Sequence, residues 1–525
     1  MPRSRPSRYV NRGPSRVLAV GFLALTLGVG CQAALTPAPT SSATVEASPT
    51  ATPSATTTAT TTSSASSSIA ASASPASGWR AAGTMTIGRY GPHAVLLGDG
   101  RVLVVGNDTA PFVRSDSITT EIWDPISDSW HATASLNQPR GDLATAALTD
   151  GRALVTGGLD QDQSCSTFSS TQRSYSSTYV FDPKADGGAW VRAGLLGTAR
   201  TAPAAAVLPD GRVLVAGGYY YTGQSAERVD APLGIAAAYH RVALGEPATV
   251  NKTLNDITPP TVGHALATAE VFDPSTGTWS ATGPMHFARF GAAATTLVDG
   301  RVLVVGSAAG AERGVASVDD RAYDSAELYD PATGRFKLVG SLPGLDAAAF
   351  SKQGKLPGYS PVVDFNGNLV SLLDGGALLV GRSSSWKHQG DVTRTFRFDA
   401  TSGSWREVGG AWVSVENPDT GAPWVTPTAR RGDASLVARL QSGRVLVAGG
   451  IGEYGAVTRT VDLFDPVTNG WSPLPPMPSP RAGGAAVTLR DGSVLLLGGF
   501  NDVAGRGGCD EPSGLTSAIR FVPAP

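Results

Sequence analysis

Five arginines occupy one repeated position in this chain, and arginine is well suited to binding anions. Each lies ten residues after a tryptophan and ten residues before an Asp-Gly pair; they are Arg89, Arg140, Arg200, Arg289 and Arg481. Arg431 follows a longer insertion and is the sixth candidate. Guanidinium groups donate paired hydrogen bonds to carboxylates and phosphates, so six around one opening would form a receptor for an acidic ligand. The alternative is structural: each arginine bonds backbone carbonyls or an acidic side chain of its own or an adjacent repeat.

Aromatic side chains in the longest variable segments form a second group that could bind a ligand. Tyr220 and Trp386 lie in two such segments, residues 219–268 and 382–393. Tyrosine and tryptophan can stack on sugars or peptides. Alternatively, they pack these long segments against the body of the protein.

Signatures of catalysis are missing from the sequence. It contains no G-x-S-x-G nucleophile elbow, no H-E-x-x-H and no C-x-x-C. Tyr239-His240 is the only adjacent Tyr-His pair, and the other histidines are scattered. We therefore expect neither a metal site nor a cofactor.

These residues belong to a repeated unit. Seven copies of a segment resembling DGRVLVVGG begin at residues 99, 150, 210, 299, 374, 442 and 491. An Asp-Gly pair between apolar runs predicts a hairpin joining the first two strands of the unit. AEVFDPSTGTW (269–279) has close copies elsewhere and predicts a third strand, an Asp-Pro turn and an outer strand. Each unit therefore predicts a four-stranded antiparallel blade, with Trp279 wedged against a neighbouring blade.

The ends of the repeat region predict how the blades close. The last copy stops after AIRF (518–521) without an outer strand, whereas GWRAAGTM (78–85) matches an outer strand and has no blade of its own. The strand near Trp79 should complete the last blade, which removes a sheet edge. The expected fold is all-β: a seven-bladed β-propeller over residues 79–525, with the arginines and the longest loops on one face.

The repeat resembles the kelch repeat of β-propellers, and the galactose oxidase central domain in particular. That family binds copper through two tyrosines and two histidines, one tyrosine being cross-linked to a cysteine. Here Tyr239 and His240 lie in a long insertion, and Cys165 is the only apparent candidate for the cross-link. No residue of the copper site can be carried over by position.

Residues 1–31 resemble the signal peptide of a bacterial lipoprotein. Several arginines precede the apolar run VLAVGFLALTLGVG (17–30), and Cys31 follows directly, where such proteins are lipidated. The match departs from the pattern at Gly28, where leucine is preferred. Residues 32–78 are almost entirely Ala, Ser, Thr and Pro, which predicts a disordered tether. The expected location is outside the cytoplasm, anchored to the membrane by lipid; ordinary cleavage and secretion is the alternative.

The charge balance argues against a nucleic-acid partner, and the cysteine count is compatible with an oxidising compartment. The 41 Lys and Arg against 43 Asp and Glu give a formal net charge of −2, without the basic surface of a nucleic-acid binder. Cys165 and Cys509 remain once Cys31 is set aside, and an oxidising compartment would allow them to form a disulfide.

Two functions from different classes fit these observations. The first is a monomeric, non-catalytic module at the bacterial cell surface that binds a protein or carbohydrate ligand, an acidic one being favoured by the arginines. The second is a carbohydrate-active enzyme of the galactose oxidase-like or sialic-acid epimerase-like kind. It rests on the fold alone, and propellers host many functions.

Overall fold

The computed structural model describes residues 78–524, except for the segments 107–118, 139, 165–166, 186, 222–262, 308–314, 317–319, 344–362, 365–367, 386–389, 410–413, 417–422, 426–433, 452–455 and 502–513. The chain divides into two units, Met1–Ser72 and Ala73–Pro525, and the described residues all belong to the second. Their regular structure is β apart from one 3₁₀ helix, η3 (Asp320–Ala322). None of the described residues forms a helix with the length and apolar character needed to cross a membrane.

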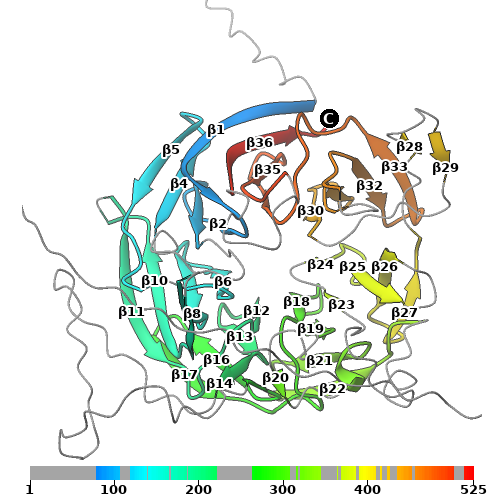
Figure 1. Ribbon diagram of the computed structural model, residues 1–525. Helices are drawn as coiled ribbons and strands as arrows, with labels where there is room; N and C mark the ends of the chain where they lie inside the picture. The colour runs from blue at the N-terminus through cyan, green and yellow to red at the C-terminus, as the bar shows by residue number, and fades with distance from the viewer. Residues whose placement is uncertain are drawn as a thin grey trace, which may run out of the picture. The chain divides into compact units, whose positions relative to one another are not determined.

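Seven antiparallel sheets of four strands form the blades of a propeller (Figure 1). From the inner to the outer strand, the first four blades are blade 1, β2 (His93–Leu96), β3 (Val102–Val105), β4 (Thr120–Asp124) and β5 (Ser129–Thr133); blade 2, β6 (Ala144–Ala147), β7 (Ala153–Thr156), β10 (Ser177–Asp182) and β11 (Ala189–Leu195); blade 3, β12 (Ala204–Val207), β13 (Val213–Ala216), β16 (Ala269–Asp273) and β17 (Thr278–Ala281); and blade 4, β18 (Ala293–Thr296), β19 (Val302–Val305), β21 (Ala326–Asp330) and β22 (Arg335–Val339). The other three are blade 5, β24 (Leu369–Ser371), β25 (Ala377–Ser385), β26 (Gly390–Asp399) and β27 (Ser404–Glu407), with β23 (Val363–Asp364) also pairing β25; blade 6, β30 (Leu436–Arg439), β31 (Val445–Ala448), β32 (Val461–Asp465) and β33 (Gly470–Leu474); and blade 7, β34 (Ala485–Thr488), β35 (Val494–Leu497), β36 (Leu515–Val522) and β1 (Gly78–Arg89).

The inner strands meet in a closed ring, because each contacts the inner strand of the next blade and β34 contacts β2. In five of the seven blades the second strand is apolar at every position and buried, as in β3 (VLVV) and β13 (VLVA), whereas β7 ends in Thr156 and β25 continues into polar residues. Each blade is covered by neighbours on both sides, so a continuous apolar run suits this strand better than alternation of polar and apolar residues. The hydrophobic core therefore lies between the blades, and residues of blades 4 and 5 share one of its clusters.

The predicted closure of the ring is confirmed. Strand β1 pairs antiparallel with β36, with Trp79 opposite Phe521, so the N-terminal strand forms the outer edge of the last blade. The two rings are 5.1 Å apart, and the Trp79 indole N–H donates to the Pro475 carbonyl of blade 6 at 2.8 Å. The beginning of the described chain is thus held by both of the last two blades.

The outer tryptophans join neighbouring blades, as predicted for Trp279. Its indole donates to Thr178 Oγ1 of blade 2 at 3.0 Å, and Trp190 donates to the Ala134 carbonyl between blades 1 and 2 at 2.8 Å. Trp279 is half-buried and packs against the cluster that blades 2 and 3 share. A repeated aromatic therefore links each of these sheets to the sheet before it.

The two faces of the propeller differ in their connections. One face carries the Asp-Gly hairpins between first and second strands and the Asp-Pro turns between third and fourth strands; we call it the turn face. The other carries the connections from second to third strands and from each blade to the next; we call it the loop face. The described chain begins on the turn face, where Gly78 pairs with Val522.

Additional strands lie on the loop face. The hairpin β8 (Leu159–Ser164)–β9 (Thr167–Ser174) belongs to blade 2, and β14 (Tyr219–Tyr221) and β15 (Gly263–Ala265) belong to blade 3. Strand β15 also pairs in parallel with β20 (Val315–Ala316) of blade 4. A further two-stranded sheet, β28 (Ser414–Glu416)–β29 (Pro423–Val425), lies in the connection from blade 5 to blade 6.

Candidate functional site

The five repeated arginines are buried on the loop face. Each precedes the inner strand of its blade, and none of the five side chains is exposed to solvent. In each case Nη1 donates to the carbonyl of the first glycine after the second strand, 17 residues along the chain. Four of these bonds measure 2.8–3.1 Å, for example 2.9 Å from Arg200 to Gly217.

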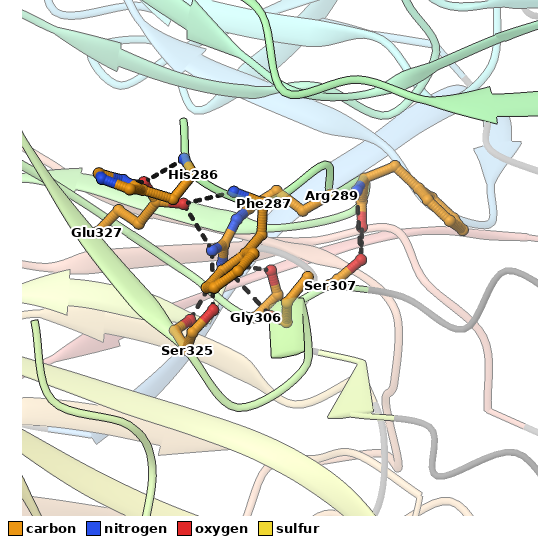
Figure 2. A network of polar contacts seen from close by, with 9 residues as sticks. His286, Phe287, Arg289, Gly306, Ser307, Ser325 and Glu327 are labelled. Atoms are coloured by element: carbon orange, nitrogen blue, oxygen red, sulfur yellow. Dashed lines mark hydrogen bonds and ion pairs between the residues drawn. The ribbon is translucent and has the colours of Figure 1, made fainter. Parts of the chain in front are cut away.

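Figure 2 shows the most complete of these networks, around Arg289. Nη1 donates to the Gly306 carbonyl at 3.1 Å and to the Ser325 carbonyl at 3.0 Å, and Nη2 donates to Ser325 Oγ at 3.0 Å and Glu327 Oε1 at 2.9 Å. The Glu327 side chain is itself fully buried, and its Oε2 accepts the backbone N–H of His286 at 2.8 Å. The His286 Nδ1 lies 2.8 Å from the same oxygen. A buried ion pair is tolerated here because both terminal guanidinium nitrogens and both carboxylate oxygens are hydrogen-bonded.

The same arginine–glutamate pair recurs in blades 1 and 3. Arg89 lies 3.0 Å from Glu121, and Arg200 lies 2.8 Å from Glu270. Each glutamate again accepts a backbone N–H from the end of the preceding outer-strand connection, with Thr86 donating to Glu121 at 2.6 Å. Our sequence reasoning missed these glutamates. The signal for them was the acidic residue at the second position of TEIWD, AEVFD and AELYD.

Blades 2 and 7 keep the arginine but lack the carboxylate. In blade 2, Tyr179 takes the glutamate position, and the Arg140 guanidinium lies 4.9 Å from its ring and 4.3 Å from the Tyr175 ring. These are cation–π contacts, which offset part of the cost of burying the charge. In blade 7, Ile519 takes the position, and burial lowers the pKa of Arg481 to about 10.

The backbone of each arginine position also links two blades. The Arg289 carbonyl accepts the N–H of Gly218 in blade 3 at 2.9 Å, and the Arg89 carbonyl accepts the N–H of Gly499 in blade 7 at 2.7 Å. Gly217 and Gly218 have φ of 68° and 89°, and a Cβ on Gly217 would lie 2.4 Å from the Arg289 carbonyl oxygen. The Gly-Gly pair is therefore required by this close approach of backbones.

These hydrogen bonds are of the kind that the structural alternative for the arginines predicts. The terminal nitrogens point into the blades, so an acidic ligand would have to displace hydrogen bonds to glycine carbonyls to reach them. A role of the arginines as a ligand receptor stays a prediction. Arg431 and Trp386 lie outside the described residues, as do Cys31, Cys165, Cys509, Tyr239 and His240.

Tyr220 is the remaining predicted ligand-binding residue. It lies on β14 opposite His264 of β15, with ring centroids 5.6 Å apart and an interplanar angle of 31°. Neighbouring Tyr219 is buried against Phe290 at 5.0 Å, in a small cluster with Leu159. Side chains alternate along a strand, so Tyr220 faces away from that cluster, and it is half-buried.

Comparison with known proteins agrees with the repeat. The model of the Kelch motif matches residues 440–478, which run from the end of the inner strand of blade 6 past its outer strand. The fold is decided by the sheets themselves, and the match adds the type of repeat in one of them. The protein is a seven-bladed β-propeller that carries a kelch motif in blade 6.

A solved structure similar to this propeller is described as a "novel fungal alcohol oxidase with catalytic diversity among the AA5 family, in complex with copper". The two are 15% identical, the match covers 85% of this chain and 76% of that chain, and the TM-score is 0.49. At that level the likeness carries no argument about activity.

The described residues can be compared with the donor set of a copper centre. No group of three or more histidine, cysteine, aspartate or glutamate side chains able to hold a metal occurs among them. Tyr220 and His264 bring together one phenol and one imidazole, which is half of the donor set of two tyrosines and two histidines.

Proposed function

We propose that this kelch propeller is a non-catalytic binding module, exported from the cytoplasm and held at the cell surface through lipid on Cys31. Its ligand is a protein or carbohydrate, bound on the loop face. The observation that carries the proposal is the joining of additional strands from blades 3 and 4 on that face: β14 pairs β15, and β15 pairs β20. The β8–β9 hairpin adjoins them, since Ser174 Oγ lies 2.7 Å from Thr201 Oγ1 and 3.4 Å from the Tyr219 carbonyl.

The buried arginine networks support this role by making the base of the loop face rigid. They fix the ends of the second and third strands, from which the additional strands extend. A rigid scaffold that carries variable loops is a common arrangement for recognition. In this proposal the arginines position the binding surface, and the additional strands provide it.

Tyr220 and His264 are the residues that we expect to contact the ligand. A tyrosine presents an apolar ring together with a hydroxyl, and such residues are enriched where proteins bind their partners. Gly78 lies on the turn face, at the opposite end of the blades from the proposed binding face.

Site-specific photocrosslinking and a glycan array would test this proposal. A photoreactive amino acid replaces Tyr220 in the full chain, and in a matched control it replaces Val467, which is 89% exposed on the turn face. We expect a discrete crosslinked product on intact cells, or retention on a defined glycan, for the protein with an intact loop face. Glycan retention should fall at least tenfold in a Tyr220→Ala, His264→Ala variant that keeps its melting temperature, and crosslinking from position 220 should fall when His264→Ala is added to the photoreactive protein. Equal crosslinking from both positions, or binding that survives the double substitution, would contradict the proposal.

The alternative is a carbohydrate-active enzyme, and the observation in its favour is the contact between Tyr220 and His264. It predicts turnover that depends on His264. Metal content after incubation with copper, followed by peroxide release on a panel of sugars and alcohols, would distinguish the two functions. Turnover by the wild-type protein that is lost in His264→Ala would replace the binding proposal.

A further inference from the structure

On the turn face, arginines bridge neighbouring blades in a second repeated pattern. The arginine after the Asp-Gly hairpin donates to the backbone carbonyl that follows the outer-turn aspartate of the next blade. Arg101 donates to the Pro183 carbonyl at 2.8 Å, and Arg152 donates to the Pro274 carbonyl at 3.0 Å. Arg301 makes the corresponding bond to Ala400 at 3.1 Å. We call this contact the turn-face bridge.

Blade 5 lacks this arginine but keeps the bridge. Gly376 stands where the arginine would be, and Arg397 of the third strand replaces it. Arg397 pairs with Asp374 and donates to the Pro466 carbonyl of blade 6 at 2.7 Å. The repeat therefore has two alternative ways of crossing a boundary between blades.

The boundary between blades 7 and 1, which closes the ring, has neither form of the bridge. Ser493 takes the place of the arginine, and Arg520 stands at the position of Arg397. Arg520 pairs with Asp491 and donates from Nε to Ser493 Oγ at 2.7 Å, both within its own blade. No hydrogen bond among the described residues joins Arg520 to the Pro125 carbonyl of blade 1.

A cleft of about 420 Å³ occupies this boundary. Blade 1 provides its outer turn and inner hairpin, and blade 7 provides its inner hairpin and third strand; the lining residues are Asp99, Gly100, Arg101, Asp124, Pro125, Ile126, Leu489, Arg490, Asp491 and Arg520. The three arginines balance the three aspartates, so the formal charge of the lining is zero. The cleft thus combines donors and acceptors with no excess of either charge.

We propose that this cleft binds one or two rings of a neutral sugar. A hydroxyl group both donates and accepts, so it can serve the Arg520 guanidinium as well as the Asp124 carboxylate and the Pro125 carbonyl. Leu489 and the 95% exposed Ile126 offer apolar surface for the C–H face of a ring. The volume lies in the usual range for small-molecule sites. A charged ligand would disturb the charge balance of the lining.

The site is separate from the proposed binding surface, because it lies on the turn face and contains none of the loop-face residues.

A pair of substitutions tests the site by giving blade 7 the arginine that forms the turn-face bridge in other blades. Ser493→Arg with Arg520→Val recreates the arrangement of blade 2, where Arg152 and Val180 hold these positions and Arg152 bridges to Pro274. The new arginine should fill the cleft, so the double variant should fold with at least wild-type stability.

Binding would be measured on the full-length protein by saturation-transfer NMR and calorimetry with methyl glycosides of glucose, galactose, mannose and N-acetylglucosamine. We expect at least one to bind with a millimolar or lower Kd, at least tenfold more weakly to the double variant, and equally well to Tyr220→Ala. Ile126→Ala, which removes a fully exposed side chain, provides a second test and should weaken binding several-fold. The proposal is overturned if no neutral glycoside binds, if glucuronic acid or glucosamine binds more tightly, or if the double variant binds as well as the wild type.

Discussion

Arg289 and Glu327 form an ion pair of 2.9 Å in which neither side chain is accessible to solvent. The pair links the connection before blade 4 to the third strand of that blade. Its glutamate also holds the backbone N–H of His286, so the interaction extends across the boundary with blade 3. Loss of one partner would leave the other charge buried.

Arg289→Met should therefore destabilise the protein strongly. We expect a loss of about 3–5 kcal/mol in the free energy of unfolding, because the Glu327 carboxyl group would be left buried without its guanidinium partner. Arg481→Met is the matched comparison, since among the described residues Arg481 bonds the Gly498 and Ser517 carbonyls and the Ser517 hydroxyl, and no carboxylate. It should cost only about 1–3 kcal/mol, for the carbonyls left without a donor. Denaturant unfolding of both variants measures the difference, and equal losses would show that the ion pair adds nothing.

Replacing both members of the pair gives the control. Blade 5 has no arginine at the equivalent position, and Phe396 replaces the glutamate in its core. Arg289→Met combined with Glu327→Leu should accordingly be more stable than Arg289→Met alone. If the double variant is less stable than Arg289→Met alone, Glu327 stabilises the protein mainly through its hydrogen bond to the His286 backbone N–H and not through its charge.

Trp79→Ala should weaken the closure of the ring. The side chain packs on Phe521 and bonds Pro475 but stays partly exposed, so we expect a loss of about 2–3 kcal/mol in the free energy of unfolding. Trp79→Phe keeps the ring contact and loses the indole bond, which should cost about 1 kcal/mol. Hydrogen exchange at β36 reports the effect directly. Unchanged protection there in Trp79→Ala would argue against a closing role.

The Asp-Gly hairpins predict a small stability change in acid. The Arg212 guanidinium, which is hydrogen-bonded to Asp210, holds the pKa of that carboxyl below its usual range. A lowered pKa in the folded state contributes stability above the unfolded pKa, and this contribution is lost as the pH falls through the folded pKa. Arg212→Gln should raise the Asp210 pKa, as followed by carboxyl NMR. It should remove less than about 1 kcal/mol at pH 7, because both side chains are well exposed. A pKa that does not move would contradict the coupling.

Cys31→Ser tests the anchor. If lipid on Cys31 holds the protein to the membrane, the wild-type chain should fractionate with membranes and incorporate a fatty-acid analogue, whereas the variant should do neither. Fatty-acid labelling that persists in Cys31→Ser would place the attachment elsewhere.

Much of the propeller could be predicted because its repeat combines strand and turn signals. The DGRVLVVGG segment specifies a hairpin and a buried strand, and the match of GWRAAGTM to an outer strand was enough to predict that β1 completes blade 7. The strand pairings on the loop face could not be predicted from the repeat. Strands β15 and β20 are short and come from different blades, so no local pattern marks them as partners.

The orientation of the arginine side chains could not be predicted from the sequence. A guanidinium group can bind an external anion at an open site or take part in a buried hydrogen-bond network, and both roles need the same residue type. Covariation within the repeat would have helped. Glutamate occurs where the preceding connection provides a backbone donor, as at Thr86 and His286. In blades 5 and 7 that donor position is Pro343 or Pro478, which has no N–H, and the glutamate is replaced by Phe396 or Ile519.

The pairing of Gly78 with Val522 has a mechanical consequence. If the tether is pulled while the loop face is held, tension passes along the axis of β1 toward Arg89. The hydrogen bonds between β1 and β36 are then perpendicular to the pulling direction, so all of them bear the force together in shear. Pulling that peeled β1 away from β36 would instead break them one at a time. A closing strand loaded in shear resists a pulling force, which would be useful to a domain that is anchored at its N-terminal end and binds a ligand on its loop face.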